Sequence, residues 1–248
     1  MSNIPVIEGS KYLIQIEDMG DSGEGIGKVN GFTIFVEDGV PKDKAIVEII
    51  KVKKNYAMGQ IVDFIEKSPY RVEPSCPIAT KCGGCQIQHI RYEEQLNLKN
   101  NKVKSVIKRI GKLEDVVVHD IIGMEEPYRY RNKAQFPIRI KDGKSIIGFY
   151  EKGTHEVVNT ENCQIQHEIN DKVIKIFRKL IEDKKISIYD EKTGKGLLRH
   201  ILTKVSFVTG DLMLVIITNG NTLPYKEEII KELTSEIPQI KSIVHNIN

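Results

Sequence analysis

The stretch Cys76-Pro-Ile-Ala-Thr-Lys-Cys82-Gly-Gly-Cys85 places three cysteines close together, and Cys163 follows far downstream. These are the four cysteines of the chain. Two glycines separate Cys82 from Cys85 and let the backbone curl around a bulky ligand, because glycine has no Cβ. Four thiolates complete one tetrahedral sulfur site. The stretch therefore predicts a loop organised around a metal.

Buried thiols and disulfides are the alternatives to a metal. Free cysteine is often a small core residue, but three cysteines around Gly-Gly are hard to place in a core. Met1–Ser10 lacks the basic-then-apolar pattern of a signal peptide. That lack favours the reducing cytoplasm, where clustered cysteines hold metal more often than they form disulfides. Zinc sites usually pair two Cys-x-x-Cys knuckles, whereas three clustered ligands plus one remote ligand favour iron–sulfur; both metals stay open here.

Composition describes an ordinary soluble protein. The chain has 248 residues, 40% of them hydrophobic and 29% charged. No apolar run approaches the roughly 20 residues of a membrane span, so no membrane partner is expected. The net charge of +3 is uneven: residues 1–68 hold 8 Lys/Arg and 11 Asp/Glu, whereas residues 91–152 hold 14 and 9. This excess favours a polyanion, although solvated lysines on a helix explain it equally well.

Residues 11–66 contain apolar runs separated by turn signals. Asn30-Gly31 is a strong hairpin signal, and Lys44–Val52 and Ala57–Ile65 are typical of strands. Five short strands predict a small β-barrel of the OB type. The pattern Gly23-Glu-Gly25-Ile-Gly27, with Gly39-Val40-Pro41 and Lys54-Asn-Tyr56 after it, resembles a TRAM domain. This resemblance implies RNA binding.

The segment Cys82-Gly-Gly-Cys85-Gln86-Ile-Gln88-His89 is similar to the iron–sulfur motif of the bacterial RNA uracil-C5 methyltransferases, which make 5-methyluridine in rRNA and tRNA. In that family the fourth ligand lies well downstream, and Cys163 in Asn162-Cys-Gln-Ile-Gln166 matches it. The resemblance implies a 4Fe-4S cluster, and a closed four-thiolate site with no visible electron partner favours a structural over a redox role. Its expected ligands are Cys76, Cys82, Cys85 and Cys163.

The rest of the chain mixes helices and strands. Tyr92–Ile110 has helical periodicity and a basic surface, and Val116–Val118 is typical of a strand. The remaining pattern predicts an α+β fold with a largely antiparallel sheet. The expected domains are a TRAM-like barrel (1–68), a cluster loop (69–90), a helix that packs on the methyltransferase domain (91–112) and an α+β central domain (113–248).

Two further motifs are candidates for RNA contact. Tyr128-Arg129-Tyr130-Arg131-Asn132-Lys133 alternates aromatic and cationic side chains, which suits base stacking and phosphate binding, although a polar surface strand has the same pattern. The family carries a similar Tyr-Arg-Asn-Lys segment, a Gly-Phe-Tyr and a Gly-x-Leu-Arg-His, matched here by Gly196-Leu-Leu-Arg199-His200. The resemblance implies RNA contact by Tyr130, Arg131, Asn132, Lys133, Arg199 and His200.

The family adds a cysteine to uracil C6 and takes a methyl group from S-adenosylmethionine, which a Rossmann-like domain binds on a Gly-rich loop. Here no Gly-rich loop follows a strand, and no cysteine is left over. We therefore expect an N-terminal portion that lacks the Rossmann-like domain, is inactive alone and has its own C-terminal methyltransferase domain as a partner. The expected substrate is rRNA, or else tRNA, in the cytoplasm. A zinc-stapled RNA-binding protein and a radical-type iron–sulfur RNA-modifying enzyme are the alternatives.

Overall fold

The computed structural model describes residues 4–248, so the start of Met1–Ser10 lies outside the described residues. The chain forms two compact units. The first runs from the N-terminus to Ser75 and continues from Cys85 to Gly123; the second combines Cys76–Gly84 with Met124–Asn248. Each unit is described by itself. No helix among the described residues has both the length and the apolar character needed to span a membrane.

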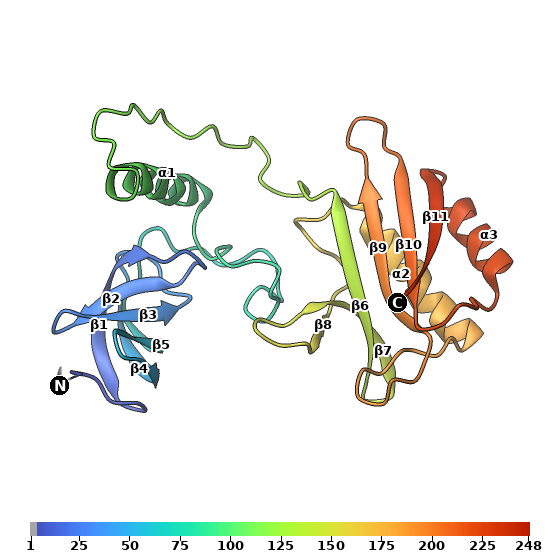
Figure 1. Ribbon diagram of the computed structural model, residues 1–248, viewed down its shortest axis with the longest axis horizontal. Coiled ribbons are helices and arrows are strands. Elements are labelled where there is room, and N and C mark those ends of the chain that lie inside the picture. Colours follow the sequence, from blue (N-terminus) through green and yellow to red (C-terminus); the bar gives the residue numbers. More distant parts are fainter. Residues whose placement is uncertain (1–3) are drawn as a thin grey trace. The chain divides into compact units, whose positions relative to one another are not determined.

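Five strands of the first unit close into a barrel in the order β1-β2-β3-β5-β4 (Figure 1). The β3–β5 pair is parallel and the other pairs are antiparallel. Inward residues alternate with outward ones, and isoleucine and valine side chains from all parts of the barrel fill its interior. The strands are β1 (Lys11–Met19), β2 (Gly25–Val29), β3 (Phe32–Glu37), β4 (Lys44–Val52) and β5 (Tyr56–Glu66).

Glycines appear where the barrel strands approach closely. A Cβ on Gly27 would lie 2.3 Å from Cγ2 of Ile14 and 2.7 Å from the Gln15 carbonyl oxygen. Asn30 and Gly31 both have positive φ, as the predicted two-residue hairpin turn between β2 and β3 requires. The glycine-rich stretch is therefore needed for barrel closure.

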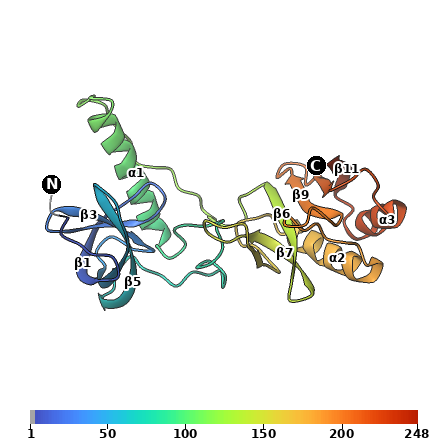
Figure 2. The same cartoon turned by 60° about the horizontal axis from the view of Figure 1, so that its bottom comes forward.

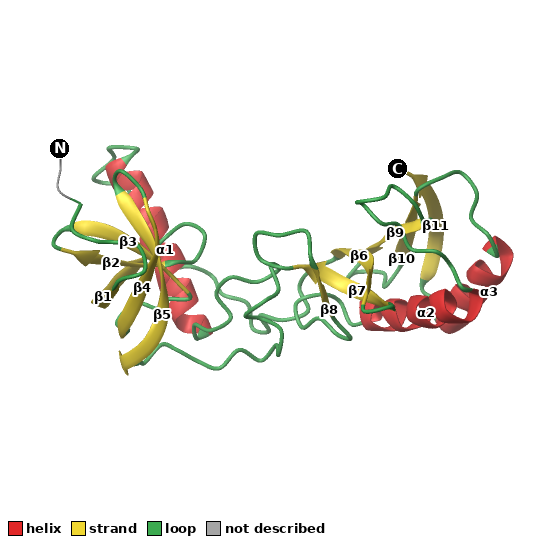
Figure 3. Ribbon diagram, turned by 90° about the horizontal axis from the view of Figure 1, so that it is seen from below, coloured by secondary structure: helices red, strands yellow, loops and turns green. Residues whose placement is uncertain are grey.

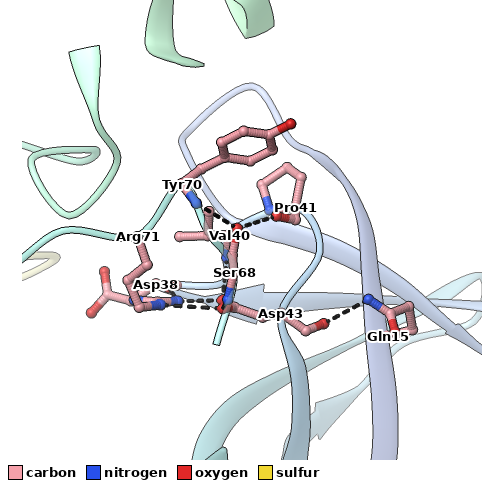
Figure 4. Close-up of polar contacts among 8 residues, drawn as sticks. All are labelled: Gln15, Asp38, Val40, Pro41, Asp43, Ser68, Tyr70 and Arg71. Atoms are coloured by element: carbon pink, nitrogen blue, oxygen red, sulfur yellow. Dashed lines mark hydrogen bonds and ion pairs between the residues drawn. The ribbon is translucent and has the colours of Figure 1, made fainter. Parts of the chain in front are cut away.

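A buried carboxylate fixes the chain where it leaves the barrel (Figure 4). Asp43 is fully buried and accepts hydrogen bonds from the backbone N–H groups of Val40 and Ser68, both at 2.8 Å. The Arg71 guanidinium donates to both Asp43 oxygens and, at 2.7 Å, to the Asp38 carbonyl. Because these partners come from the β3–β4 turn and from the segment after β5, Asp43 ties the two segments together.

Helix α1 (Tyr92–Arg109) forms as predicted, although none of its residues is buried. Its last apolar position, Ile110, is 77% exposed and follows the helix as its C-cap. The strand expected at Val116–Val118 does not form, and this segment is irregular. β-Branched residues favour strands only where a partner strand completes the ladder, and none pairs with this segment among the described residues.

The second unit is a six-stranded sheet in the order β11-β10-β9-β6-β7-β8. Helices α2 (Ile169–Lys184) and α3 (Lys226–Glu236) lie together on one face, where their apolar residues join the strand residues in one core (Figures 2 and 3). Lys179 and Glu232 link the two helices at 2.9 Å. The strands are β6 (Lys133–Lys141), β7 (Lys144–Tyr150), β8 (Val157–Asn159), β9 (Leu198–Val205), β10 (Leu212–Thr218) and β11 (Ile240–Ile247).

The predicted fold class needs correction at the end of this sheet. β10 and β11 are parallel and are joined by α3, so they form a βαβ unit in a mixed sheet. Units of this type are the elements from which Rossmann-like sheets are built. The prediction that such architecture is absent from the chain is therefore wrong. A strand's apolar pattern does not reveal whether its neighbour runs parallel or antiparallel.

Candidate functional site

The cysteine loop packs on the end of β7 in the second unit. Cys82 forms an isolated bridge with Glu151, and the Gly83 N–H donates to the Tyr150 carbonyl at 2.9 Å. A Cβ on Gly83 would lie 3.1 Å from that same oxygen. The Cys82 Sγ in turn accepts the Gly84 N–H at 3.4 Å. The glycines thus allow close docking of the loop and leave an N–H directed at sulfur.

Cys163 lies in the turn that leads into α2. Its carbonyl accepts hydrogen bonds from Arg129 at 2.9 Å and from the Gln166 N–H at 3.2 Å. Arg129 also forms an ion pair with Asp171 at 3.2 Å, and the Asp171 carboxylate accepts the Cys163 N–H at 3.3 Å. The backbone of this cysteine is therefore held from both sides.

Three thiols of the second unit lie near enough to affect one another. Burial raises the pKa of the Cys82 thiol; the neighbouring Cys76 raises it further, whereas Arg131 lowers it. Burial also raises the pKa of the Cys163 thiol, and Cys82 and Cys76 add to that effect. Buried thiols become thiolate ligands most readily when a metal replaces the proton.

The fourth cysteine, Cys85, begins the second segment of the first unit and follows Gly84 directly in the chain. Its Sγ accepts a hydrogen bond from the Gln88 side-chain amide at 3.2 Å. All four cysteines are free thiols, which excludes the disulfide interpretation for this structure. Within residues 4–248, no group of three or more His, Cys, Asp or Glu side chains is arranged to hold a metal ion. The donor set nevertheless fits, because iron–sulfur clusters are held by cysteine thiolates and tuned by hydrogen bonds to sulfur.

The segment Tyr130–Lys133 lies at the start of β6, beside the turn that contains Cys163. The Arg131 N–H donates to the Ile165 carbonyl at 2.9 Å, and the Arg131 side chain donates to the Gly84 carbonyl at 3.3 Å. Tyr130, Arg131, Asn132 and Lys133 are all exposed. The structure therefore places these four predicted RNA contacts together on the surface, next to the cysteine loop.

Arg199 and His200 lie elsewhere, on β9. The Arg199 guanidinium stacks over the Tyr189 ring at 4.1 Å and donates to the Asn248 carbonyl at 3.1 Å. His200 is only 7% exposed, and its Nε2 lies 3.2 Å from the Tyr150 hydroxyl. These two residues are thus separate from the exposed Tyr130–Lys133 segment.

The environment of His200 includes residues that sequence reasoning missed. The Arg139 side chain donates to the Tyr150 hydroxyl at 3.4 Å and forms an ion pair with Glu191. Burial, together with the positive charges of Arg139 and Arg199, lowers the pKa of His200 to about 4. His200 is therefore neutral near pH 7 and suited to holding Tyr150 in place rather than to binding phosphate. No local sequence signal links these residues, because β6, β7, β9 and a loop bring them together.

The sequence is similar to those of known proteins. Residues 5–62 match the TRAM domain family. A Clostridium tetani protein named as an uncharacterized RNA methyltransferase is 50% identical over 246 residues, which are 99% of this chain and 53% of that protein. A Bacillus cereus protein of the same description is 45% identical over 98% of this chain and 53% of its own length. The chain thus contains a TRAM domain and is similar to RNA methyltransferases.

One solved structure extends the comparison. It is the Pyrococcus abyssi tRNA (uracil-54, C5)-methyltransferase in complex with S-adenosyl-L-homocysteine. The match has a TM-score of 0.64 and 26% identity, and covers 88% of this chain and 48% of that chain. The chain spans about half the length of the curated relatives it matches.

These matches also correct the expectation of an N-terminal portion without methyltransferase architecture. The similarity runs along nearly the whole chain, and so includes the parallel βαβ unit of the second unit. The expectation that the chain is inactive rested on this supposed absence and loses its support. The expectation was based on the lack of a Gly-rich loop after a strand and of a cysteine beyond the four of the cluster. A βαβ unit forms without such a loop.

Proposed function

We propose that this chain recognises RNA for the S-adenosylmethionine-dependent methylation of uracil at C5. The single observation that carries the proposal is the combination, in one chain, of a TRAM domain with 50% identity to a protein named an RNA methyltransferase. We propose a uridine in rRNA as the substrate, and the Pyrococcus abyssi relative, named for tRNA uracil 54, makes tRNA the second candidate.

In this proposal the exposed Tyr130–Lys133 segment binds the RNA backbone and stacks on unpaired bases. Neutral His200 holds the Tyr150 hydroxyl, with Arg139 on its other side. S-adenosylmethionine supplies the methyl group when it is bound. The contribution of the described residues is therefore to orient the RNA.

We further propose that Cys76, Cys82, Cys85 and Cys163 hold a 4Fe-4S cluster with a structural role. The N–H groups directed at the Cys82 and Cys85 sulfurs support this, as does the position of Cys163 close to the other thiols of its unit. Protein purified without oxygen should contain about four irons and four acid-labile sulfides per chain. One zinc and no sulfide would instead favour the zinc-stapled RNA-binding module.

Mapping of 5-methyluridine in cells tests the methylation. Deletion of the gene that encodes this chain should remove 5-methyluridine from one position of rRNA or tRNA, and the restored gene should return it. Unchanged 5-methyluridine in both RNA classes would contradict the proposed function.

A further inference from the structure

The strands of the second unit carry no acidic side chain. None of the six contains Asp or Glu; β6, β7, β9 and β11 contain Lys or Arg, whereas β8 and β10 have no charged residue. Helices α2 and α3, by contrast, hold seven acidic and seven basic residues between them. Positive charge is therefore concentrated in the sheet, whereas the helix layer is balanced.

Two lysines stand opposite each other at one end of this sheet. Lys133 of β6 pairs with Lys204 of β9, and directly opposed residues lie about 5 Å apart at Cα. The next pair, Ala134 and Thr203, is buried, and Thr203 donates to Asn170 of α2. Because side chains alternate between the faces of a sheet, both lysines lie on the face away from the helices. Neither forms an ion pair with a residue of the described chain.

Folding alone does not explain this pair, because like charges directly opposite each other destabilise a sheet. Arg139 lies on the same face, but Glu191 neutralises it. Asp211, the acid of the β9–β10 hairpin, accepts a hydrogen bond from Thr209 within that hairpin. The lysine pair thus presents uncompensated positive charge where a bound anion would stabilise it.

Two aromatic side chains belong to segments that adjoin the lysine pair in the fold. Phe207, three residues after Lys204, is 55% exposed, and its ring centroid lies 5.3 Å from that of His167. The backbone N–H of His167 donates to the Arg131 carbonyl at 3.2 Å, and the ring Nδ1 of His167 accepts the Ile169 backbone N–H at 3.2 Å. These bonds hold His167 beside Arg131, two residues before Lys133, so that the ring pair belongs to the same end of the sheet as the two lysines.

We propose that Lys133, Lys204, Phe207 and His167 form a binding site for single-stranded RNA. The two amines bind one phosphate, and an unpaired base stacks on the Phe207–His167 surface. Duplex RNA does not fit this chemistry, because its bases are stacked on one another and cannot reach the rings. The inference rests on the proposed function, since it names the strandedness and the contacts of the same RNA ligand.

Fluorescence anisotropy with the full chain tests this site. The probes are a labelled uridine-rich single-stranded 12-mer and the same strand in a duplex. Lys204→Ala should weaken binding of the single strand and make the slope of log K against log salt about 0.7 shallower, as expected for one lost phosphate contact. Phe207→Ala should weaken binding about tenfold or more, whereas Phe207→Tyr should retain the affinity because the ring remains.

Matched controls separate this site from general charge and shape effects. Lys241→Ala removes an exposed lysine from the far edge strand β11, and Val208→Ala trims the exposed neighbour of Phe207. Both should bind like the unmodified chain. Wild-type affinity in Lys204→Ala and Phe207→Ala would overturn the site but leave the proposed function intact. An equal loss in the controls, or equal affinity for the duplex, would also overturn it, and no RNA binding by the unmodified chain would overturn both ideas.

Discussion

Replacing Asp43 by Asn tests whether the buried carboxylate stabilises the barrel. Asp43 is fully buried, and each of its oxygens faces two N–H donors: Oδ1 accepts from Ser68 and Arg71, and Oδ2 from Val40 and Arg71. Whichever way the asparagine amide turns, its NH₂ group faces donors instead of an acceptor. The guanidinium, only 16% exposed, loses its charged partner.

Two estimates bound the expected loss of barrel stability in Asp43→Asn. Hydrogen bonds to a charged group contribute about 1.5–3 kcal/mol each, and removal of one partner of a buried ion pair costs about 3–5 kcal/mol. Because Arg71 keeps its bond to the Asp38 carbonyl and some contact with water, we expect about 3 kcal/mol. This corresponds to roughly a hundredfold increase in the open population of the barrel.

Hydrogen exchange followed by mass spectrometry on peptides from β1–β5 measures this population for the barrel alone. A global unfolding curve is less suitable, since the two units need not unfold together. Glu37→Gln makes the same acid-to-amide change at an exposed barrel position and should change the opening free energy by less than about 0.5 kcal/mol. Protection in Asp43→Asn that falls no more than in this control would refute the reasoning.

Three further predictions concern the second unit. Cys163→Ser should lose most of the iron and sulfide of anaerobically purified protein; full retention would exclude Cys163 as a ligand. The pKa of His200 is about 4 in the folded chain and 6.5 in the unfolded chain, so on acidification the unfolded chain takes up this proton at the higher pH. Stability should therefore fall by about 3 kcal/mol as pH drops from 6.5 to 4. Hydrogen exchange on peptides from β6–β9 at each pH should show this dependence, and His200→Gln should remove it. In Gly148→Ala the new Cβ would lie 1.8 Å from the Val158 carbonyl oxygen. The same assay should show a loss of stability above about 2 kcal/mol. Wild-type stability would contradict the close approach of β7 and β8.

Local patterns predicted those parts of the fold that depend on neighbours in sequence. The Asn30-Gly31 turn and helix α1 form where the sequence indicates them, because positive φ and helical periodicity are local properties. The strand direction of β11 was missed, since an eight-residue apolar pattern fits either orientation. The burial of His200 was missed as well, because Arg199-His200 is a polar pair in sequence and only the sheet places the imidazole beside Tyr150.

The net charge of sequence segments is also a poor guide to where a polyanion would bind. Residues 153–248 contain equal numbers of acidic and basic residues and therefore gave no indication of a polyanion site. In the structure the acidic residues of the two helices lie in the layer that covers one face of the sheet. Lys204 lies on the other face, directly across from Lys133 of the neighbouring strand. A phosphate responds to the charges within about a Debye length of 8–10 Å, not to the total of a sequence window. The electrostatic surface of this unit is thus set by strand register, which pairs a lysine from the basic segment with one from a segment of zero net charge.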